Sequence, residues 1–228
     1  MIETFPTAQA AADAAAEAIV GQLTPPGPQR LMVTGGRGPG PVYDRLAKID
    51  LGWSRVTVTL SDDRFTPPDA AQSNERLVRE RLLRGHAAAA AFVPLKARGP
   101  TAADDAATAE PAIAALLPFD ASLLGMGPDG HIASLFPSTP DVGALLDPDA
   151  ARRVVGVDVA GLEPFLPRIS LTGRALFASR LIVLLVSGEA KRALIERVAL
   201  DPGFAPPVSA LMRQTRSPVR ILWSPGDP

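Results

Sequence analysis

Short apolar segments alternate with segments of helical character along the whole sequence, and this alternation strongly constrains the fold. Residues 181–186 are almost continuously apolar, as expected of a strand that is buried on both faces. The following residues, 189–200, have the pattern of a helix. Strands and helices that alternate favour a parallel sheet covered by helices on both faces. We therefore predict an α/β protein with a doubly wound, mainly parallel sheet in a Rossmann-like three-layer arrangement.

The predicted elements follow one another with short connections. We expect strands at residues 30–34, 55–60, 119–124, 152–159, 169–171, 181–186 and 219–223, and helices at residues 7–23, 41–48, 73–84, 102–117, 172–179, 189–200 and 208–214. Thr7 and Ser73 are predicted N-caps, and Pro111 is expected to kink or split its helix. The alanine-rich residues 87–93 are ambiguous. No break in composition separates two parts, so we expect one domain over residues 1–228.

The composition is typical of a globular protein and argues against several kinds of partner. Of the 228 residues, 46% are hydrophobic and 21% are charged. The net charge is -1, and no basic tract indicates binding to nucleic acid or to anionic lipid. Residues 181–186 form the longest strongly apolar run, which is too short to span a bilayer. The first residues do not resemble a signal peptide. We expect a cytoplasmic protein, either a monomer or a weak homo-oligomer.

Several kinds of catalytic centre are disfavoured by the residues present. Cysteine is absent, which excludes disulfides, thiolate catalysis and cysteine-ligated metals. The two histidines, His86 and His131, lie far apart and give no zinc-ligand pattern, and His86 is expected at the surface without a role. Ser134 lacks the context of a nucleophile elbow. No Gly-x-Gly-x-x-Gly turn follows a strand, which argues against a dinucleotide-dependent oxidoreductase.

A glycine-rich loop after the predicted strand 119–124 carries the strongest catalytic candidate. The loop has the sequence Gly125-Met126-Gly127-Pro128-Asp129-Gly130-His131. Glycines let the backbone approach a ligand closely, and histidine is the side chain best suited to proton transfer near neutrality. Because open α/β sheets bind ligands at the carboxyl ends of their strands, His131 is a candidate acid or base. The simpler alternative is that His131 only caps a helix.

The tripeptide Asp62-Asp63-Arg64 follows another predicted strand. Neighbouring side chains of a strand alternate in direction, so Asp62 and Arg64 can face one side while Asp63 faces the other. The alternative is a surface ion pair in solvent. Ser73 and Asn74, farther along the chain, are explained equally well as a helix cap.

Three other segments carry groups suited to an anion. Gly35-Gly36-Arg37 joins a predicted strand to a helix, where backbone N–H groups and an arginine can hold a phosphate. The turn matches neither the Walker nor the dinucleotide fingerprint, and a structural turn is the alternative. Lys191 lies in the first turn of a predicted helix, where its charge opposes the helix dipole and a bound anion would compensate it. An exposed lysine is the alternative there. Arg168 follows Pro167 near another predicted strand.

Together these loops resemble the 6-phosphogluconolactonase family, within the glucosamine-6-phosphate isomerase/6-phosphogluconolactonase superfamily. The most specific part is the histidine motif, residues 125–131, with Ala133-Ser134-Leu135-Phe136-Pro137 after it. Residues 62–64 with Ser73-Asn74 resemble the family's Asp-Glu-Arg … Ser-Asn signature, and residues 35–37, 167–171 and 188–191 resemble other segments. Gly38, Asp63 and Ile132 depart from the family pattern, in which a serine or threonine, a glutamate and a threonine are usual.

The resemblance implies a carboxylic ester hydrolase that needs neither metal nor organic cofactor. Its reaction would be hydrolysis of the phosphorylated sugar lactone 6-phospho-D-glucono-1,5-lactone to 6-phospho-D-gluconate, in the oxidative pentose phosphate pathway. We expect His131 to be the general base and Arg64 to stabilise the carbonyl oxygen, with either Asp62 or Asp129 orienting the imidazole or the water. The residues expected to hold the phosphate are Gly35, Gly36, Arg37, Arg168 and Lys191.

Two other functions fit the same scaffold. A sugar-phosphate isomerase or deaminase of the glucosamine-6-phosphate type has an Asn-Glu-Pro segment after its histidine, whereas this chain has Ser134-Leu135-Phe136-Pro137 and no carboxylate there. A non-catalytic sugar-phosphate sensor would not need His131, Asp62 and Arg64 together, and no basic appendage accompanies the chain. We rank both functions below the lactonase.

Overall fold

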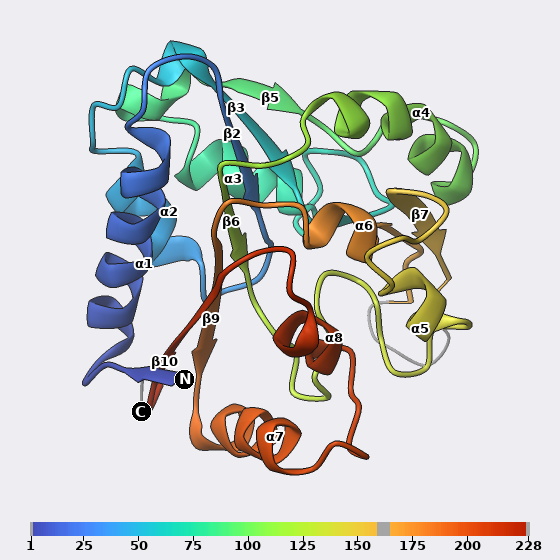
Figure 1. Ribbon diagram of the computed structural model, residues 1–228. Coiled ribbons are helices and arrows are strands. Elements are labelled where there is room, and N and C mark those ends of the chain that lie inside the picture. Colours follow the sequence, from blue (N-terminus) through green and yellow to red (C-terminus); the bar gives the residue numbers. More distant parts are fainter. Residues whose placement is uncertain (1, 159–164, 227–228) are drawn as a thin grey trace.

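The computed structural model describes residues 2–158 and 165–226 and is built around a parallel sheet (Figure 1). Within those ranges the main sheet has seven strands, in the spatial order β1 (Ile2–Thr4), β10 (Val219–Ser224), β9 (Ile182–Ser187), β6 (Ala121–Leu124), β2 (Gln29–Val33), β3 (Val56–Leu60) and β5 (Ala91–Val93). Each pair of neighbouring strands in this sheet is parallel. The predicted α/β fold with a mainly parallel sheet is confirmed.

Helices cover the main sheet from two sides. The helices of the described ranges are α1 (Ala8–Leu23), α2 (Gly40–Leu46), α3 (Asn74–Arg81), α4 (Ala102–Ala115), α5 (Val142–Leu145), α6 (Gly173–Leu176), α7 (Glu189–Leu200) and α8 (Val208–Arg213), with 3-10 turns η1 (Trp53–Arg55) and η2 (Gly85–Ala89). Figure 1 shows α1 and α2 on one side of the sheet, and α6 and α8 on the other. No helix in the described ranges has the length and apolar character needed to cross a membrane.

Local sequence signals mark where α1 and α3 begin. The hydroxyls of Thr7 and Ser73 accept hydrogen bonds from the amides of Ala10 (3.1 Å) and Arg76 (3.3 Å), which confirms both predicted N-caps. Of the two outcomes predicted for Pro111, a split helix is wrong, because α4 continues through this residue, and a kink stays a prediction. Pro111 lies on the exposed side of α4, where water can satisfy the carbonyl group that the missing N–H leaves without a partner.

The order of the strands places a crevice at the centre of the main sheet. From β2, the next strands of the main sheet, β3 and β5, are added on one side. The later strands β6, β9 and β10 are added on the other side of β2. The order therefore reverses between β2 and β6. Open α/β sheets bind ligands outside the carboxyl ends of the strands at such a switch point. The Gly35–Gly38 segment follows β2 and the histidine loop follows β6, so both lie at this crevice.

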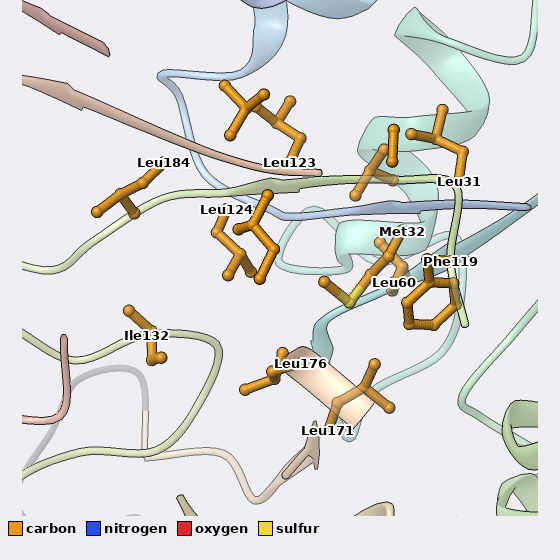
Figure 2. Packing of buried hydrophobic residues seen from close by; sticks show 14 of the residues in the cluster. Leu31, Met32, Leu60, Phe119, Leu123, Leu124, Ile132, Leu171, Leu176 and Leu184 are labelled. Carbon is orange, nitrogen blue, oxygen red and sulfur yellow. The ribbon is translucent and has the colours of Figure 1, made fainter. Parts of the chain in front are cut away.

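The strands on either side of the switch point are buried on both faces. Leu31 and Met32 of β2 and Leu123 and Leu124 of β6 are all fully buried. Because successive side chains point to opposite faces of a sheet, each pair packs into both layers, as Figure 2 shows. Burial of one such side chain stabilises the fold by about 1.5–3 kcal/mol. This packing explains why the central strands are apolar without alternation.

A second, smaller sheet was not predicted. It pairs β4 (Asp62–Arg64) with β8 (Arg168–Leu171) and β8 with β7 (Val154–Val157), both antiparallel. The strands predicted at residues 152–159 and 169–171 belong to this sheet, and residue 159 lies outside the described residues. Short strand patterns do not show which sheet a segment joins. Here the chain continues from β3 through Ser61 into β4, and β4 then pairs with β8.

Two short strands at the edges of the main sheet, β1 and β5, were also not predicted as strands. Strand β1 is only three residues long and pairs with β10. The ambiguous residues 87–93 divide between η2 and β5, which pairs with β3. Short edge strands are incompletely buried, so they lack the strong apolar pattern that marks the central strands.

Candidate active site

A cleft of about 360 Å³ opens at the carboxyl edge of the main sheet. Its walls come from the segments after β2, β3 and β6 and from the ends of β9 and β10. Of the residues predicted to form the site, Gly35, Gly36, Arg37, Asp62, Arg64, His131 and Lys191 line this cleft. Groups from distant parts of the sequence therefore face one space. The other two predicted residues, Asp129 and Arg168, contact or pair with residues of this set.

A tight loop holds His131 at the wall of the cleft. The Gly127 amide donates to the His131 carbonyl (2.9 Å), and the Gly130 amide donates to the Gly127 carbonyl (3.1 Å). Gly130 has a φ of 83°, a conformation that favours glycine. Residues 132–141 are all described and contain no helix, so the alternative that His131 caps a helix is wrong.

Asp129 is the carboxylate that contacts the imidazole. Its Oδ1 lies 2.6 Å from Nδ1 of His131 and also accepts from the His131 amide (3.2 Å). An ionised carboxylate can only accept hydrogen bonds, so this contact favours the tautomer with the proton on Nδ1. Nε2 of the neutral ring then carries the lone pair and can take up a proton. The Phe136 ring packs against the imidazole with a centroid separation of 4.4 Å.

Asp62 faces the same cleft but has other partners. Its Oδ1 accepts a hydrogen bond from the Ser61 hydroxyl (2.8 Å), and its Oδ2 accepts one from the Ser134 hydroxyl (2.7 Å). The Asp62 side chain is buried. Because Ser134 lies just after His131 in the chain, Asp62 ties the histidine segment to β4.

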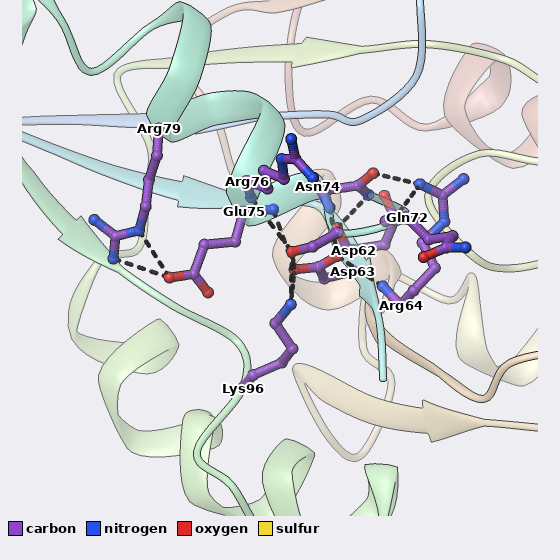
Figure 3. Close-up of polar contacts among 10 residues, drawn as sticks. Asp62, Asp63, Arg64, Gln72, Asn74, Glu75, Arg76, Arg79 and Lys96 are labelled. Carbon is purple, nitrogen blue, oxygen red and sulfur yellow. Dashed lines mark hydrogen bonds and ion pairs between the residues drawn. The ribbon is translucent and has the colours of Figure 1, made fainter. Parts of the chain in front are cut away.

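Arg64 lines the cleft from β4, while the Asp63 side chain lies on the opposite side (Figure 3). One guanidinium nitrogen of Arg64 donates to the Asn74 side-chain oxygen (2.7 Å) and to the Gln72 carbonyl (3.0 Å). The predicted alternation along residues 62–64 is therefore present. Asp63 is fully buried, so a surface ion pair is the wrong description of this tripeptide.

The glycine loop, residues 35–38, forms another part of the cleft wall. Its backbone turns at Gly36, which has a φ of 92°. The Tyr43 hydroxyl donates a hydrogen bond to the Thr34 carbonyl, just before the loop. Burial raises the pKa of Tyr43, which keeps this donor protonated. The loop is thus anchored from α2 while its own surface faces the cleft.

Lys191 lines the cleft from the first turn of α7. Its side chain is half-buried, and burial lowers the pKa of its ammonium group. A cation near a helix N-terminus that is partly removed from water lies in unfavourable surroundings. A bound anion would compensate for both effects. Ser187 and Ser224, which are register partners at the ends of β9 and β10, line the same cleft.

Arg168 lies opposite Arg64 in the smaller sheet and is buried. Burial and the neighbouring Arg64 charge lower the pKa of Arg168, whereas Asp62 and Asp63 favour its charged form. Within the described residues it is not part of the cleft lining. Contact between Arg168 and a phosphate therefore stays a prediction.

Sequence reasoning assigned no site role to Asn74, Ser134 or Lys96. The sequence explains Asn74 equally well as part of a helix cap, yet this residue lines the cleft and its side chain binds Arg64. Gly35 packs so closely against Asn74 that a Cβ on Gly35 would overlap it. The sequence argues against Ser134 as a nucleophile and gives it no other role, whereas its hydroxyl donates to Asp62. The signal for Asn74 was its place downstream of residues 62–64, but Lys96 belongs to no motif.

The cleft places a side chain suited to proton transfer beside groups suited to binding an anion. One side holds an imidazole oriented by a carboxylate, and the glycine loop and Lys191 provide N–H groups and a cation. The described residues contain no cluster of three or more histidine, aspartate or glutamate side chains suited to a metal ion. The absence of a cofactor stays a prediction.

Comparison with known proteins identifies the family. The family model described as glucosamine-6-phosphate isomerases/6-phosphogluconolactonase matches residues 5–223. The chain belongs to this family. It is 47% identical over 227 residues to a 6-phosphogluconolactonase of Caulobacter vibrioides, covering 98% of this chain and 97% of that protein. A 6-phosphogluconolactonase of Rhizobium meliloti is 37% identical over 220 residues, covering 96% and 94% of the two chains.

Solved structures agree with this family assignment. The crystal structure of a 6-phosphogluconolactonase from Shewanella baltica superposes with a TM-score of 0.92 at 33% identity, covering 98% of this chain and 97% of that one. The likeness therefore extends across the whole fold. The prediction that the chain is an enzyme of the 6-phosphogluconolactonase family is confirmed at the level of the family.

Proposed function

We propose that this protein hydrolyses 6-phospho-D-glucono-1,5-lactone to 6-phospho-D-gluconate in the oxidative pentose phosphate pathway. The observation that carries the proposal is that His131, paired with Asp129, faces the same cleft as the glycine loop and Lys191. Hydrolysis of a phosphorylated lactone needs a base beside the carbonyl group and an anion site at the other end of the sugar. The names of the relatives at 47% and 37% identity support the same reaction.

In the proposed first step, Nε2 of His131 takes a proton from a water molecule. The resulting hydroxide adds to the lactone carbonyl carbon, and the carbonyl oxygen becomes negatively charged. Arg64 stabilises this charge, because a cation placed where charge develops stabilises the transition state. Asp129 holds the Nδ1 proton and favours the imidazolium that forms.

In the proposed second step, the tetrahedral intermediate collapses and the bond between the carbonyl carbon and the ring oxygen breaks. The imidazolium of His131 returns its proton to that oxygen, which becomes a hydroxyl group. The new carboxylic acid loses its proton to solvent, so one water is consumed for each lactone opened. Asp62 keeps the segment after His131 in place through Ser134.

The phosphate group would act as an anchor and take no part in bond making. Residues 35–37 and Lys191 are proposed to hold it, with Arg168 contributing charge from the smaller sheet. Anchoring the far end of the sugar places the carbonyl carbon beside His131 and lowers the entropic part of the barrier. Ser187 and Ser224 are available on the same wall, and Gly38 supplies no hydroxyl group.

Gly127→Ala tests the position of the imidazole. A Cβ on Gly127 would overlap the His131 ring, so the ring must move. We expect kcat to fall about tenfold, because a displacement of the base by a fraction of an ångström to 1 Å is costly. Steady-state kinetics and thermal unfolding are measured on the same sample. Gly143→Ala is the matched control, since a Cβ there meets nothing within 4 Å. Unchanged kcat in Gly127→Ala would contradict the assigned ring position.

The proposed function is tested by a pH-stat assay on freshly prepared 6-phosphogluconolactone, with spontaneous opening subtracted. Catalysed acid release is expected with the phosphorylated lactone and far less with unphosphorylated gluconolactone. Ammonia release from glucosamine 6-phosphate would instead identify a deaminase. Tight binding of 6-phosphogluconate without turnover would identify a sensor. Either result would replace the proposal.

We also infer that residues 1–228 form one domain that acts as a monomer or a weak homo-oligomer in the cytoplasm. The cleft takes residues from the start of α1 to the end of β10, which supports a single folding unit. The proposed substrate carries a phosphate charge, which opposes passage through a bilayer. A single cooperative unfolding transition and a monomeric mass in dilute solution are the expected results.

A further inference from the structure

Lys96 forms a buried ion pair beneath the cleft. Its ammonium nitrogen lies 2.8 Å from Oδ2 of Asp63 and donates to the Ser73 hydroxyl (2.7 Å) (Figure 3). The Lys96 side chain is 6% exposed and the Asp63 side chain is not exposed at all. In the described structure Lys96 does not line the cleft, so its charge acts through the residues around it.

Asp63 uses its other acceptor positions on backbone N–H groups. Its Oδ1 accepts from the amides of Arg64 (2.8 Å) and Asn74 (2.7 Å), and its Oδ2 accepts from the amide of Glu75 (3.2 Å) and also from the Ser73 hydroxyl (3.3 Å). Asn74 and Glu75 begin α3, where amides have no partner within the helix. One carboxylate therefore joins the start of α3 to the backbone of β4 at Arg64.

Asn74 carries this connection to the Arg64 side chain. Its side-chain nitrogen donates to the Asp62 carbonyl (2.8 Å), and its side-chain oxygen accepts from the Arg64 guanidinium (2.7 Å). The guanidinium is thus positioned by the first residue of α3, and the first residue of α3 is positioned by Asp63. A chain of direct contacts links Lys96 to the cation that lines the cleft.

We propose that Lys96 is a positioning residue for Arg64. Its ammonium compensates the buried charge of Asp63, which can then hold the start of α3 and the Arg64 backbone in one arrangement. Without the ammonium, the buried carboxylate would lose the cation that pairs with it directly, an unfavourable state that moves it or its partners. The inference rests on the proposed function only in giving Arg64 its role at the carbonyl oxygen.

Lys96→Met is expected to lower kcat for the lactone about tenfold, because Arg64 loses its fixed position. KM is expected to change less than kcat, because Lys191 lies on α7, outside this chain of contacts, although Gly35 of the glycine loop packs against Asn74. Lys96→Arg, which keeps the charge, is expected to recover most of the lost rate. Asp120→Asn is the matched control. Asp120 is a buried carboxylate that accepts a hydrogen bond from the Arg30 amide of β2, and it lies at the amino ends of the parallel strands, whereas the cleft lies at their carboxyl ends.

A double-mutant cycle separates positioning from a general loss of stability. In an Arg64→Ala background, Lys96→Met is expected to change kcat by less than about twofold, because the group it positions is gone. A merely structural lysine would lower kcat by the same factor in both backgrounds, and that result would overturn the inference. Wild-type kcat in a folded Lys96→Met protein would overturn it as well.

A second variant and an exchange measurement test the role of Lys96 if Lys96→Met does not fold or if the protein does not open the lactone. If Lys96→Met does not fold, Lys96→Gln replaces it, and failure of both to fold would assign Lys96 a structural role and reject the proposal. If the wild-type protein does not open the lactone, the proposed function fails by itself. Hydrogen exchange at the Asn74 and Glu75 amides then tests the inference, with faster exchange expected in Lys96→Met and unchanged exchange rejecting it.

Discussion

Replacing His131 by asparagine is expected to lower kcat for 6-phosphogluconolactone by about two to four orders of magnitude. The asparagine side chain can still donate a hydrogen bond towards Asp129, but it has no nitrogen that takes up a proton from water. The proton-transfer step therefore loses its carrier while the loop keeps its main contact. KM is expected to change little, because the phosphate anchor is unaffected. The pH-stat assay, corrected for spontaneous opening, measures both quantities.

His86→Asn is the matched control for this substitution. His86 is the other histidine of the chain, and it is exposed in η2 and lies outside the described cleft lining. Its replacement is expected to leave kcat and KM unchanged. Near-normal turnover in His131→Asn, with the fold intact by circular dichroism, would remove the assignment of His131 as the base.

The parts of the fold that sequence could predict are those with strong local signals. Residues 181–186 are apolar without alternation because their strand is covered on both faces, and this pattern is typical of central parallel strands. Thr7 and Ser73 mark helix starts through their own hydroxyl groups. The glycine and histidine loops could be placed together because the carboxyl ends of parallel strands share one edge of a sheet.

The parts that could not be predicted depend on contacts between segments distant in sequence. The pairing of β4 with β8 brings Arg168 opposite Arg64, and neither of these short strands has a pattern that indicates its partner. The choice between Asp62 and Asp129 as partner of His131 needed the loop geometry, in which Asp129 reaches Nδ1. Lys96 lies in an irregular segment between β5 and α4, so its contact with Asp63 had no local signal at all.

Replacing Lys191 by methionine is expected to raise KM by about 10- to 150-fold with kcat nearly unchanged. A hydrogen bond to a charged group contributes about 1.5–3 kcal/mol, which corresponds to this range of affinity. A rise in KM with kcat unchanged shows that the lost interaction was equally strong in the ground state and in the transition state. With unphosphorylated gluconolactone, which has no group for Lys191 to hold, the variant and the wild type are expected to behave alike.

Lys48→Met makes the same chemical change at an exposed lysine just after α2 and is the control for net charge. It is expected to leave KM for the phosphorylated lactone unchanged. If Lys191→Met also leaves KM unchanged while the phosphate is still required, then the anchor lies elsewhere on the cleft wall, and the assignment of Lys191 is wrong.

The pH dependence of product binding is expected to reveal the same interaction. Burial lowers the pKa of Lys191 in the free protein, whereas a bound phosphate favours the charged ammonium and raises that pKa again. At a pH between the Lys191 pKa of the free protein and that of the complex, Lys191 takes up a proton when 6-phosphogluconate binds. The affinity therefore falls as the pH rises through this range. The phosphate itself is fully ionised there, since its second pKa is about 6. Calorimetry in alkaline buffers of different ionisation heat measures the uptake, and equal uptake by wild type and Lys191→Met would show that another group binds the phosphate.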